Sequence, residues 1–338
     1  MNRAELVKTL ELVKPALASK NLVPIFQSFT FTTGSVSAYD DTIAIVGPCE
    51  IEEACGIHGN TLLGILSNIS AEEVSLELKA DTAILSAGKS VTKLPFDSED
   101  NFIFKEPTGK WDFKVPFTQS LFEAMELCLE TVSVDETQAA LHGVTIDGNK
   151  LYSCNGDTIT RVQIKEGSKG RVLMPTQFCT SVVKLWSSLE MTKGILHFND
   201  EWVWANFEDW AVYGRVLVVD NPIDFEALIK RTIKDKVPTQ AVPDGFSEAL
   251  SRARILADPE SKMTSATVSK GRLKLTTETH MGEIKDDLAF KGHPDVEANV
   301  NASHLYRALQ HCDKFAIHEN CTVFEKGTEV LQLVSNMG

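Results

Sequence analysis

The sequence lacks the features of a membrane-spanning, secreted or nucleic-acid-wrapping protein. No apolar run among its 338 residues approaches the roughly 20 residues that a membrane helix needs. Glu5, Lys8 and Glu11 stand where a signal peptide requires an unbroken apolar segment, so we expect a cytoplasmic protein without a membrane partner. The formal net charge of −14 argues against a basic surface that wraps nucleic acid, although it is compatible with a local basic lining.

Patterns of cysteine pairing and metal binding are also missing. The chain has 7 cysteines, at positions 49, 55, 128, 154, 179, 312 and 321, but it has no C-x-x-C pair. Several of them stand inside apolar helix or strand patterns, which favours reduced, mostly buried thiols over a disulfide framework or a zinc site. We therefore expect no metal and no cofactor.

Motifs of common enzyme classes are absent as well. The chain has no Walker loop, G-x-S-x-G or H-E-x-x-H string, and residues 166–170 lack the spacing of a phosphate loop. Paired aspartates at 40–41 and 286–287 are interpreted as solvated turns rather than metal ligands. His304 and His311 share one face of an expected helix without a third ligand. The sequence predicts no catalytic residues.

What the chain does contain is a threefold repeat. Residues 141–164 alternate like two strands around a turn at 147–149, with a second turn at 155–157. Similar segments occur at 26–45 and 264–275, each between helical patterns, and repeats begin roughly 115–130 residues apart, which suits duplicated domains. We expect an α+β protein in which each domain packs two helices on antiparallel sheets, with domains at residues 1–109, 112–233 and 238–338.

Apolar periodicity predicts the individual elements. Helices are expected at 4–18, 61–69, 118–130 with Thr118 as N-cap, from 176 onward, 246–256 and 301–311. Pro24 is expected to open a strand, and Gly47-Pro48 to interrupt the strand pattern. Further strands are expected at 74–78, 83–85, 91–94, 195–198, 202–207, 212–219, 315–324 and 330–334.

Short strings spaced along nearly the whole chain are similar to those of one known family. They are LVKP at 12–15 with LVPIF at 22–26 (like its helix and "LPIL" strand), KLPF at 93–96 ("LPADDFP"), NGDTI at 155–159 ("TDGHRLA"), Met174-Pro175, residues 219–225 ("DGRFPDYRRV") and residues 251–260 ("RAAILSNEK"). In this order and spacing, they make the chain resemble the bacterial DNA polymerase III beta sliding clamp and its phage-encoded relatives.

The resemblance implies a non-enzymatic processivity factor. Members form a head-to-tail ring around duplex DNA, here expected as a homodimer, with the helices facing the hole and the sheets outside. A closed ring stays on DNA topologically, so weak, sequence-independent phosphate contacts suffice. The implied partners are double-stranded DNA, a DNA polymerase and a clamp-loading ATPase. The candidate DNA-contacting bases, expected on the helices, are Lys8, Lys14, Lys20, Lys184, Arg252, Arg254, Arg307 and Lys314.

Two protein-binding sites also follow from the resemblance. Ring closure would use the apolar pair Ile255 and Leu256, with Phe102 or Phe104 opposite, although ordinary core positions are an equal alternative for these two phenylalanines. A cleft for partner peptides would lie between the second and third domains. Its matching residues are Leu141, Cys154, Gly156, Asp157, Thr158, Ile159, Ile223, Leu228, Leu333 and Met337.

The chain departs from the family at informative positions. The expected 118–130 helix carries Glu123, Glu126 and Glu130 where the family has bases, which predicts a patchy positive lining. The family's His-Arg pair after the turn glycine is Asp157-Thr158 here, its proline is displaced to Pro222, and its terminal "MPMRL" corresponds to VSNMG. These changes predict altered partner specificity, for example for a phage polymerase or loader. The competing interpretation is an acidic interaction protein that mimics DNA or scaffolds partners without encircling DNA.

Overall fold

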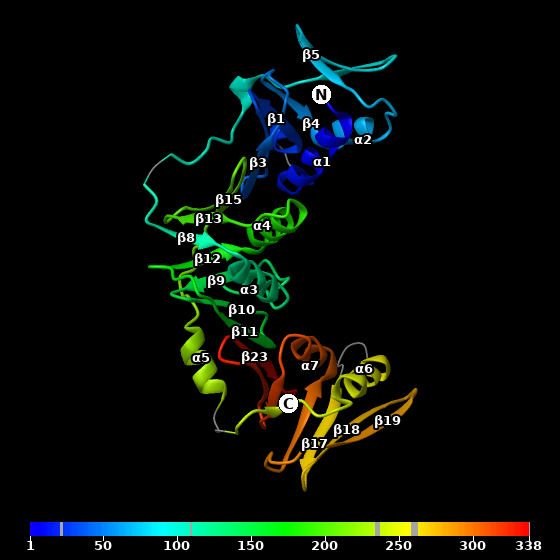
Figure 1. Cartoon of the computed structure of the whole chain (residues 1–338), viewed down its shortest axis with the longest axis vertical. Helices are drawn as coiled ribbons and strands as arrows, with labels where there is room; N and C mark the ends of the chain where they lie inside the picture. The colour runs from blue at the N-terminus through cyan, green and yellow to red at the C-terminus, as the bar shows by residue number, and fades with distance from the viewer. Residues whose placement is uncertain (21–22, 109, 234–236, 258–262, 338) are drawn as a thin grey trace. The chain divides into compact units, whose positions relative to one another are not determined.

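A computed structural model describes residues 1–20, 23–108, 110–233, 237–257 and 263–337 (Figure 1). The chain divides into two compact units, unit 1 with Met1–Phe122 and Met174–Leu217, and unit 2 with Glu123–Leu173 and Val218–Gly338. Parts of the expected second domain belong to both units, so the division into three domains remains a prediction. The expected boundaries at 109 and 338, part of the second linker (234–236), residue 22 of the LVPIF string and residues 258–260 of the 251–260 string lie outside the described residues.

Unit 1 is centred on one antiparallel sheet with the strand order β4-β1-β2-β3-β15-β14-β13-β8. Two distant parts of the chain meet where β3 pairs with β15, and Ala44 lies opposite Tyr213 at this border. The sheet therefore continues across the border of the expected first and second domains. Its strands are β1 (Ser28–Thr32), β2 (Ser35–Tyr39), β3 (Ile43–Pro48), β4 (Cys55–His58), β8 (Phe113–Phe117), β13 (Gly194–Phe198), β14 (Trp202–Phe207) and β15 (Trp210–Arg215).

Helices cover one face of the unit 1 sheet (Figure 1). Helix α1 (Arg3–Val13) begins at Asn2, whose side-chain oxygen accepts hydrogen bonds from two backbone amides of the first turn. Its buried stripe packs on β2 and β3, α4 (Thr176–Ser188) packs on β15, and α2 (Gly59–Ser67) packs on α1. A smaller sheet in the order β5-β6-β7 consists of β5 (Ser75–Lys79), β6 (Thr82–Ala87) and β7 (Ser90–Pro95).

Unit 2 repeats this plan with the sheet order β12-β9-β10-β11-β23-β22-β21-β16. A second sheet has the order β19-β18-β17-β20. The strands are β9 (Gly143–Asp147), β10 (Lys150–Cys154), β11 (Thr158–Gln163), β12 (Arg171–Pro175), β16 (Gln240–Ala241), β17 (Met263–Ser269), β18 (Arg272–Thr279), β19 (Gly282–Ala289), β20 (Val296–Asn301), β21 (Lys314–Ile317), β22 (Cys321–Lys326) and β23 (Val330–Ser335).

The core of unit 2 lies between its helices and these sheets. Helix α6 (Phe246–Leu256) packs on β18 and β19, and α7 (Ala302–Leu309) packs on α6, β20, β22 and β23. The ring of Phe246 stacks on that of Phe315 with centroids 4.6 Å apart, so the apolar face of α6 is buried against the sheet. The remaining helices are α3 (Gln119–Leu129) and α5 (Phe225–Thr232).

Most expected elements are confirmed, with local exceptions. Helix α6 and strand β14 have the predicted bounds, and Thr118 accepts a hydrogen bond from Leu121 as the predicted N-cap. The strand predicted to open at Pro24 is wrong, because Pro24–Gln27 form a 3-10 helix. The expected break at Gly47-Pro48 is also wrong, since β3 continues to Pro48.

Further corrections concern unit 2 and the ends of strands. The aspartates at 286–287 lie within β19 and not in a turn. The predicted strand 315–324 is two strands, β21 and β22, and the predicted strand 212–219 ends at Arg215. Residues 141–164 contain the three strands β9, β10 and β11 rather than two, and α5 is absent from the predicted elements.

Two negative findings hold for the part of the chain that the structure describes. None of its helices is long and apolar enough to cross a membrane. Within the same residues, no group of three or more His, Cys, Asp or Glu side chains is arranged to hold a metal ion.

Candidate partner-binding and nucleic-acid-binding sites

An apolar cluster beneath α5 brings together many of the predicted peptide-binding residues. Figure 1 shows α5 on the face of the unit 2 sheet opposite to α7. We call this group the α5 cluster. Its buried members are Tyr152, Cys154, Ile159, Phe225, Ile229, Cys321, Val323, Leu331 and Leu333, and the half-buried Leu141, Ile223, Leu228 and Ile233 pack against them.

Strand register explains why these residues meet. Cys154 lies opposite Ile159 in the β10–β11 hairpin, and Ile159 lies opposite Leu333 where β11 pairs with β23. Helix α5 docks through Phe225, whose ring stacks on Tyr152 with centroids 5.0 Å apart and an angle of 8° between planes. The predicted residues Cys154, Ile159 and Leu333 are therefore the floor of the α5 cluster.

Charged groups hold α5 at one side of the α5 cluster. The Glu226 carboxylate accepts hydrogen bonds of 2.8 Å from both Lys150 Nζ and Tyr152 Oη, and Arg161 lies 3.6 Å away. Burial alone would raise the pKa of Glu226, but the hydrogen bonds and the two positive charges outweigh it and lower the pKa. Burial and the hydrogen bond to Glu226 raise the pKa of Tyr152. An ionised Glu226 thus ties α5 to β10 and β11.

The turn that follows β10 lies beside the α5 cluster. Asn155 accepts backbone hydrogen bonds from Asp157 at 3.1 Å and Thr158 at 2.8 Å, and Gly156 has φ +97°, a conformation that suits glycine. Gly156 and Asp157 are exposed, whereas Thr158 is buried in β11. The turn therefore presents an acidic side chain where the sequence comparison expected a base.

An open pocket of about 580 Å³ lies next to this turn. Its lining combines acidic, basic and apolar groups. Val134 is 94% exposed at its rim, which leaves an apolar side chain available to a partner. The lining residues are Leu129, Glu130, Val132, Ser133, Val134, Asn155, Asp157 and Arg307.

Met337 lies elsewhere than the α5 cluster. Its backbone amide donates to the carbonyl of Asn299 at 2.7 Å, which extends the chain after β23 along β20. The half-buried Met337 is thus held by the β19-β18-β17-β20 sheet. Among the predicted cleft residues, Met337 is the one whose backbone contact points to a different sheet.

Candidate DNA-contacting bases of unit 1 lie on its helix face. Lys8 on α1, Lys14 in the turn after α1, Lys20 beyond it and Lys184 on α4 are all exposed. Lys184 Nζ donates to the carbonyl of Glu11 at 3.3 Å, so α1 and α4 are neighbours. The helices of unit 1 therefore place these lysines on one side of the sheet.

Two candidate bases on α6 already have partners. The Arg252 guanidinium lies 2.5 Å from the Asp286 carboxylate on β19, and the Arg254 guanidinium lies 4.3 Å from the centre of the Tyr306 ring. Both side chains are exposed on average, so they can still meet solvent. Their present contacts, however, fix α6 to β19 and α7.

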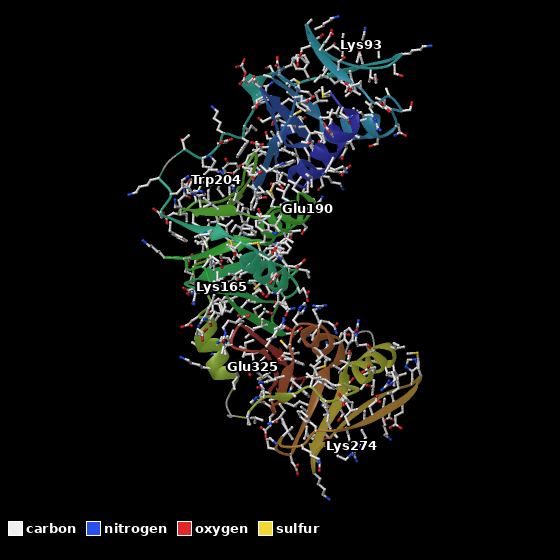
Figure 2. The ribbon with its side chains drawn as sticks, in the orientation of Figure 1. Lys93, Lys165, Glu190, Trp204, Lys274 and Glu325 are labelled. Atoms are coloured by element: carbon white, nitrogen blue, oxygen red, sulfur yellow. The ribbon has the colours of Figure 1, made fainter. Side chains whose placement is uncertain are left out.

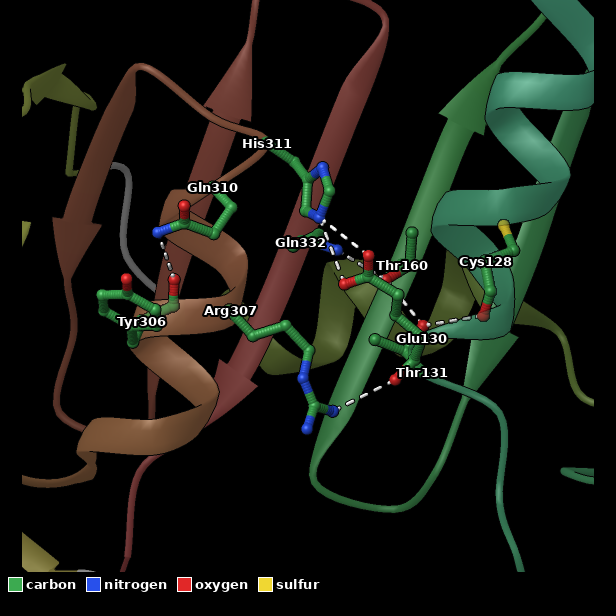
Figure 3. Close-up of polar contacts among 9 residues, drawn as sticks. All are labelled: Cys128, Glu130, Thr131, Thr160, Tyr306, Arg307, Gln310, His311 and Gln332. Carbon is green, nitrogen blue, oxygen red and sulfur yellow. Dashed lines mark hydrogen bonds and ion pairs between the residues drawn. The ribbon is translucent and has the colours of Figure 1, made fainter. Parts of the chain in front are cut away.

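The remaining candidate bases differ in their location. Arg307 on α7 donates to the backbone carbonyl of Glu130 at 3.1 Å, as Figure 3 shows. Lys314 is the first residue of β21, so its predicted place on a helix is wrong. Glu130 also lies 3.0 Å from His311, and these contacts join the end of α3 to α7 and the turn after it (Figure 3).

The predicted ring-closing residues fall into two groups. Ile255 is 81% exposed on α6, and Leu256 beside it is half-buried. Phe102 and Phe104 instead pack against an apolar cluster of unit 1, with the Phe104 ring 5.2 Å from Tyr39. This packing favours the core alternative for both phenylalanines.

Sequence reasoning missed two edge strands with exposed apolar side chains. Strand β7 is the edge of its sheet and carries Val91, which is 63% exposed. Strand β19 is the edge of another sheet, and Met281 just before it is 62% exposed. Alternation in β7 predicted a strand, but sequence alone does not show which strand is an edge.

Comparison with known proteins agrees with this architecture. No protein-family model and no curated protein sequence matches the chain. Solved structures do, each covering 100% of this chain and 98% of the other. They are a putative DNA polymerase III beta subunit from Eubacterium rectale (TM-score 0.88, 14% identity), the DNA polymerase III beta subunit from Thermotoga maritima (0.85, 18%) and a DnaN sliding clamp from Bartonella birtlesii bound to griselimycin (0.88, 18%).

The chain therefore has the fold of a DNA sliding clamp. More particularly, this is the fold of DNA polymerase III beta subunits, built from helices packed on antiparallel sheets over the full length of the chain. The resemblance and the fold class predicted from the sequence are confirmed.

Proposed function

We propose that the chain is a non-enzymatic DNA sliding clamp that encircles duplex DNA and tethers a polymerase and other partners. The observation that carries the proposal is the full-length match to sliding clamps with TM-scores up to 0.88. In this proposal the protein works in the cytoplasm and is loaded by an ATPase. The α5 cluster is its site for partner peptides.

DNA contact in this proposal is weak and electrostatic. The exposed lysines of α1 and α4 meet phosphates, while topology prevents escape, so the net charge of −14 is no obstacle. Arg252 and Arg254 contribute less than these lysines, because Asp286 and Tyr306 already hold them.

Ring closure in this proposal joins two copies head to tail through edge strands. Strand β7 carries Lys93 as its one charged residue, and Figure 2 shows Lys93 on the small sheet of unit 1. Strand β19, GEIKDDLA, has three acids and one base, so the two edges have opposite formal charge. Exposed Val91 at one edge and Ile255 beside the other add apolar area.

Partner binding in this proposal combines an apolar pocket with an acidic rim. Leu141, Ile223 and Leu228 are half-buried around the α5 cluster and accept apolar side chains of an extended peptide. Exposed Asp157 disfavours acidic peptides and favours basic ones. Tight binding of a standard host clamp-binding peptide, measured by calorimetry, would contradict this altered specificity.

Topological linkage is the decisive test. The protein is loaded on nicked circular DNA with a clamp-loading ATPase, isolated by gel filtration, and the DNA is then cut once. A clamp stays on the circle and is released on linearisation. Retention that is unchanged by cutting, or no loading at all, would favour the alternative of an acidic interaction protein that does not encircle DNA.

A further inference from the structure

The outer face of the unit 1 sheet is the counterpart of the α5 cluster. Both large sheets have the same arrangement, β4-β1-β2-β3-β15-β14-β13-β8 in unit 1 and β12-β9-β10-β11-β23-β22-β21-β16 in unit 2. Strands β2, β3 and β15 therefore correspond to β10, β11 and β23. Each border strand pairs antiparallel with a strand from a distant part of the chain.

Residue register makes the correspondence specific. In unit 2, Cys154 faces Ile159, and Ile159 faces Leu333. In unit 1, Tyr39 faces Ala44, and Ala44 faces Tyr213. The floor positions of the α5 cluster thus recur in unit 1, with two tyrosines at the outer positions.

A fourth position extends this aromatic surface. Val323 lies opposite Leu333 in unit 2, and Trp204 lies opposite Tyr213 in unit 1. The rings of Trp204 and Tyr213 are stacked with centroids 5.6 Å apart, and Figure 2 shows Trp204 on the face of the sheet opposite to the helices. We call Tyr39, Ala44, Trp202, Trp204 and Tyr213 the aromatic surface.

The chain covers the aromatic surface with its own segment. Residues 102–108 have no regular secondary structure and follow the small sheet of unit 1. The Phe104 ring lies between Tyr39 and Tyr213, at 5.2 and 5.4 Å, and the Trp111 ring lies 5.4 Å from Trp204. The contacts resemble those of an extended peptide that inserts aromatic side chains into a pocket.

Two details show how this cover fits. The cavity left beside Phe102 and Phe104 is about 10 Å³, no more than a single water occupies, so the phenylalanines fill it. The indole nitrogen of Trp204 is nevertheless buried without a hydrogen-bond partner among the described residues. A bound peptide with a carbonyl at that point would accept this bond, so the resident segment fills the surface but leaves one polar group unsatisfied.

We propose that the aromatic surface is a second peptide-docking site, occupied in the isolated chain by its own Phe102–Phe104 segment and Trp111. Its ligand is an extended peptide with two aromatic side chains two positions apart, as in Phe102-Ile103-Phe104. This inference takes from the proposed function only that the α5 cluster binds peptides. A tethered ligand has an effective concentration on the order of millimolar, so it excludes a free peptide of micromolar affinity.

The probe is a fluorescent peptide with the sequence of residues 99–106, EDNFIFKE. Removing the resident anchors with Phe102→Ala/Phe104→Ala should allow the probe to bind at least tenfold more tightly than to the wild-type chain, measured by fluorescence anisotropy. Ile103→Ala is the matched control, because Ile103 is 48% exposed between the two anchors, and it should bind the probe like the wild type. A probe with both phenylalanines replaced by alanine should bind neither.

The outcomes separate this proposal from the proposed function. Equal binding to wild type and double variant, or no binding to a double variant with a wild-type circular dichroism spectrum, overturns it. Loss of probe binding on adding Leu228→Asp to the double variant also overturns it, because the probe would then occupy the α5 cluster. If the double variant does not fold, Phe104→Leu replaces it, with a smaller gain in probe affinity expected and no gain as the contrary result.

Discussion

Glu130 and His311 are 181 residues apart in the chain, yet the Nε2 atom of His311 lies 3.0 Å from one carboxylate oxygen of Glu130 and 3.1 Å from the other. Both side chains are about one third exposed, at 34% and 32%. Their contact joins the residue after α3 to the turn after α7, so it connects parts of two expected domains within unit 2.

The first prediction concerns this pair. A double-mutant cycle with Glu130→Ala and His311→Ala should give a coupling of about 0.5 kcal/mol in the free energy of unfolding, because partly exposed ion pairs contribute little. Urea denaturation followed by circular dichroism measures it. Glu126→Ala, an exposed carboxylate on the same helix, is the control and should show no coupling to His311. A coupling above about 2 kcal/mol would mean that the pair is far more desolvated than its exposure indicates.

The second prediction separates the candidate DNA contacts. Lys8→Ala should reduce the slope of log affinity against log salt by about 0.9, the value for one phosphate contact. Arg252→Ala should change the slope less, because Asp286 holds its guanidinium at 2.5 Å. Binding of a short duplex is measured by anisotropy at several salt concentrations, with Lys165→Ala as a control outside the helices. Equal effects of Lys165→Ala and Lys8→Ala would argue against a DNA-binding helix face.

The third prediction concerns ring closure. Val91→Asp on β7 or Ile255→Asp on α6 should shift the protein from dimer to monomer in sedimentation velocity, because each places a charge in an apolar contact. Val218→Asp is the matched control, since Val218 is 82% exposed but lies on neither edge strand. A dimer that survives both edge substitutions would exclude these strands as the interface.

The fourth prediction concerns the α5 cluster. Leu228→Asp should weaken binding of a peptide from the cognate polymerase at least tenfold, because it puts a charge at the rim of an apolar site. Ala227→Asp changes the neighbouring, exposed residue and should leave affinity within twofold. Calorimetry measures both. Equal loss in the two variants would indicate that α5 itself is disturbed.

The fifth prediction follows from the lowered pKa of Glu226. A carboxylate whose pKa is lower in the folded state stabilises the protein above its unfolded value, here 4.5, and this contribution is lost as the pH falls through the folded value. Unfolding free energies between pH 3 and 7 should therefore fall less steeply below pH 4.5 for Glu226→Gln than for the wild type. Glu136→Gln, an exposed control, should follow the wild type. Identical profiles for all three proteins would contradict a stabilising role of the ionised carboxylate.

Local sequence patterns predicted the elements whose periodicity is strong. Helix α6 has its apolar residues at helical spacing after Gly245, and β14 alternates between two turns, so both were predicted at their observed bounds. Strand β19 was missed because as an edge strand it is exposed or half-buried along its whole length, which leaves no apolar alternation to detect. Helix α5 was missed because its 8 residues include only two that are buried.

The candidate site shows the same limit. Cys154, Ile159 and Leu333 were proposed from a resemblance, and strand pairing brings them together. Tyr152, Phe225 and Glu226, which fix α5 to the sheet, were not proposed, because their contact depends on the docking of a helix that the pattern does not reveal. Lys314 was misplaced because the helix before it ends at Leu309, several residues earlier than expected.

Hydrogen bonding across the domain borders has a consequence for dissecting this protein. Strand β11 has β10 on one side and β23 on the other, and β23 comes from nearly 170 residues further along the chain. A fragment that stops before β23 would expose the free N–H and C=O groups of β11 as a template for other strands. Excised repeats should therefore aggregate or exchange strands between molecules, and the clamp repeats are best understood as parts that fold only together.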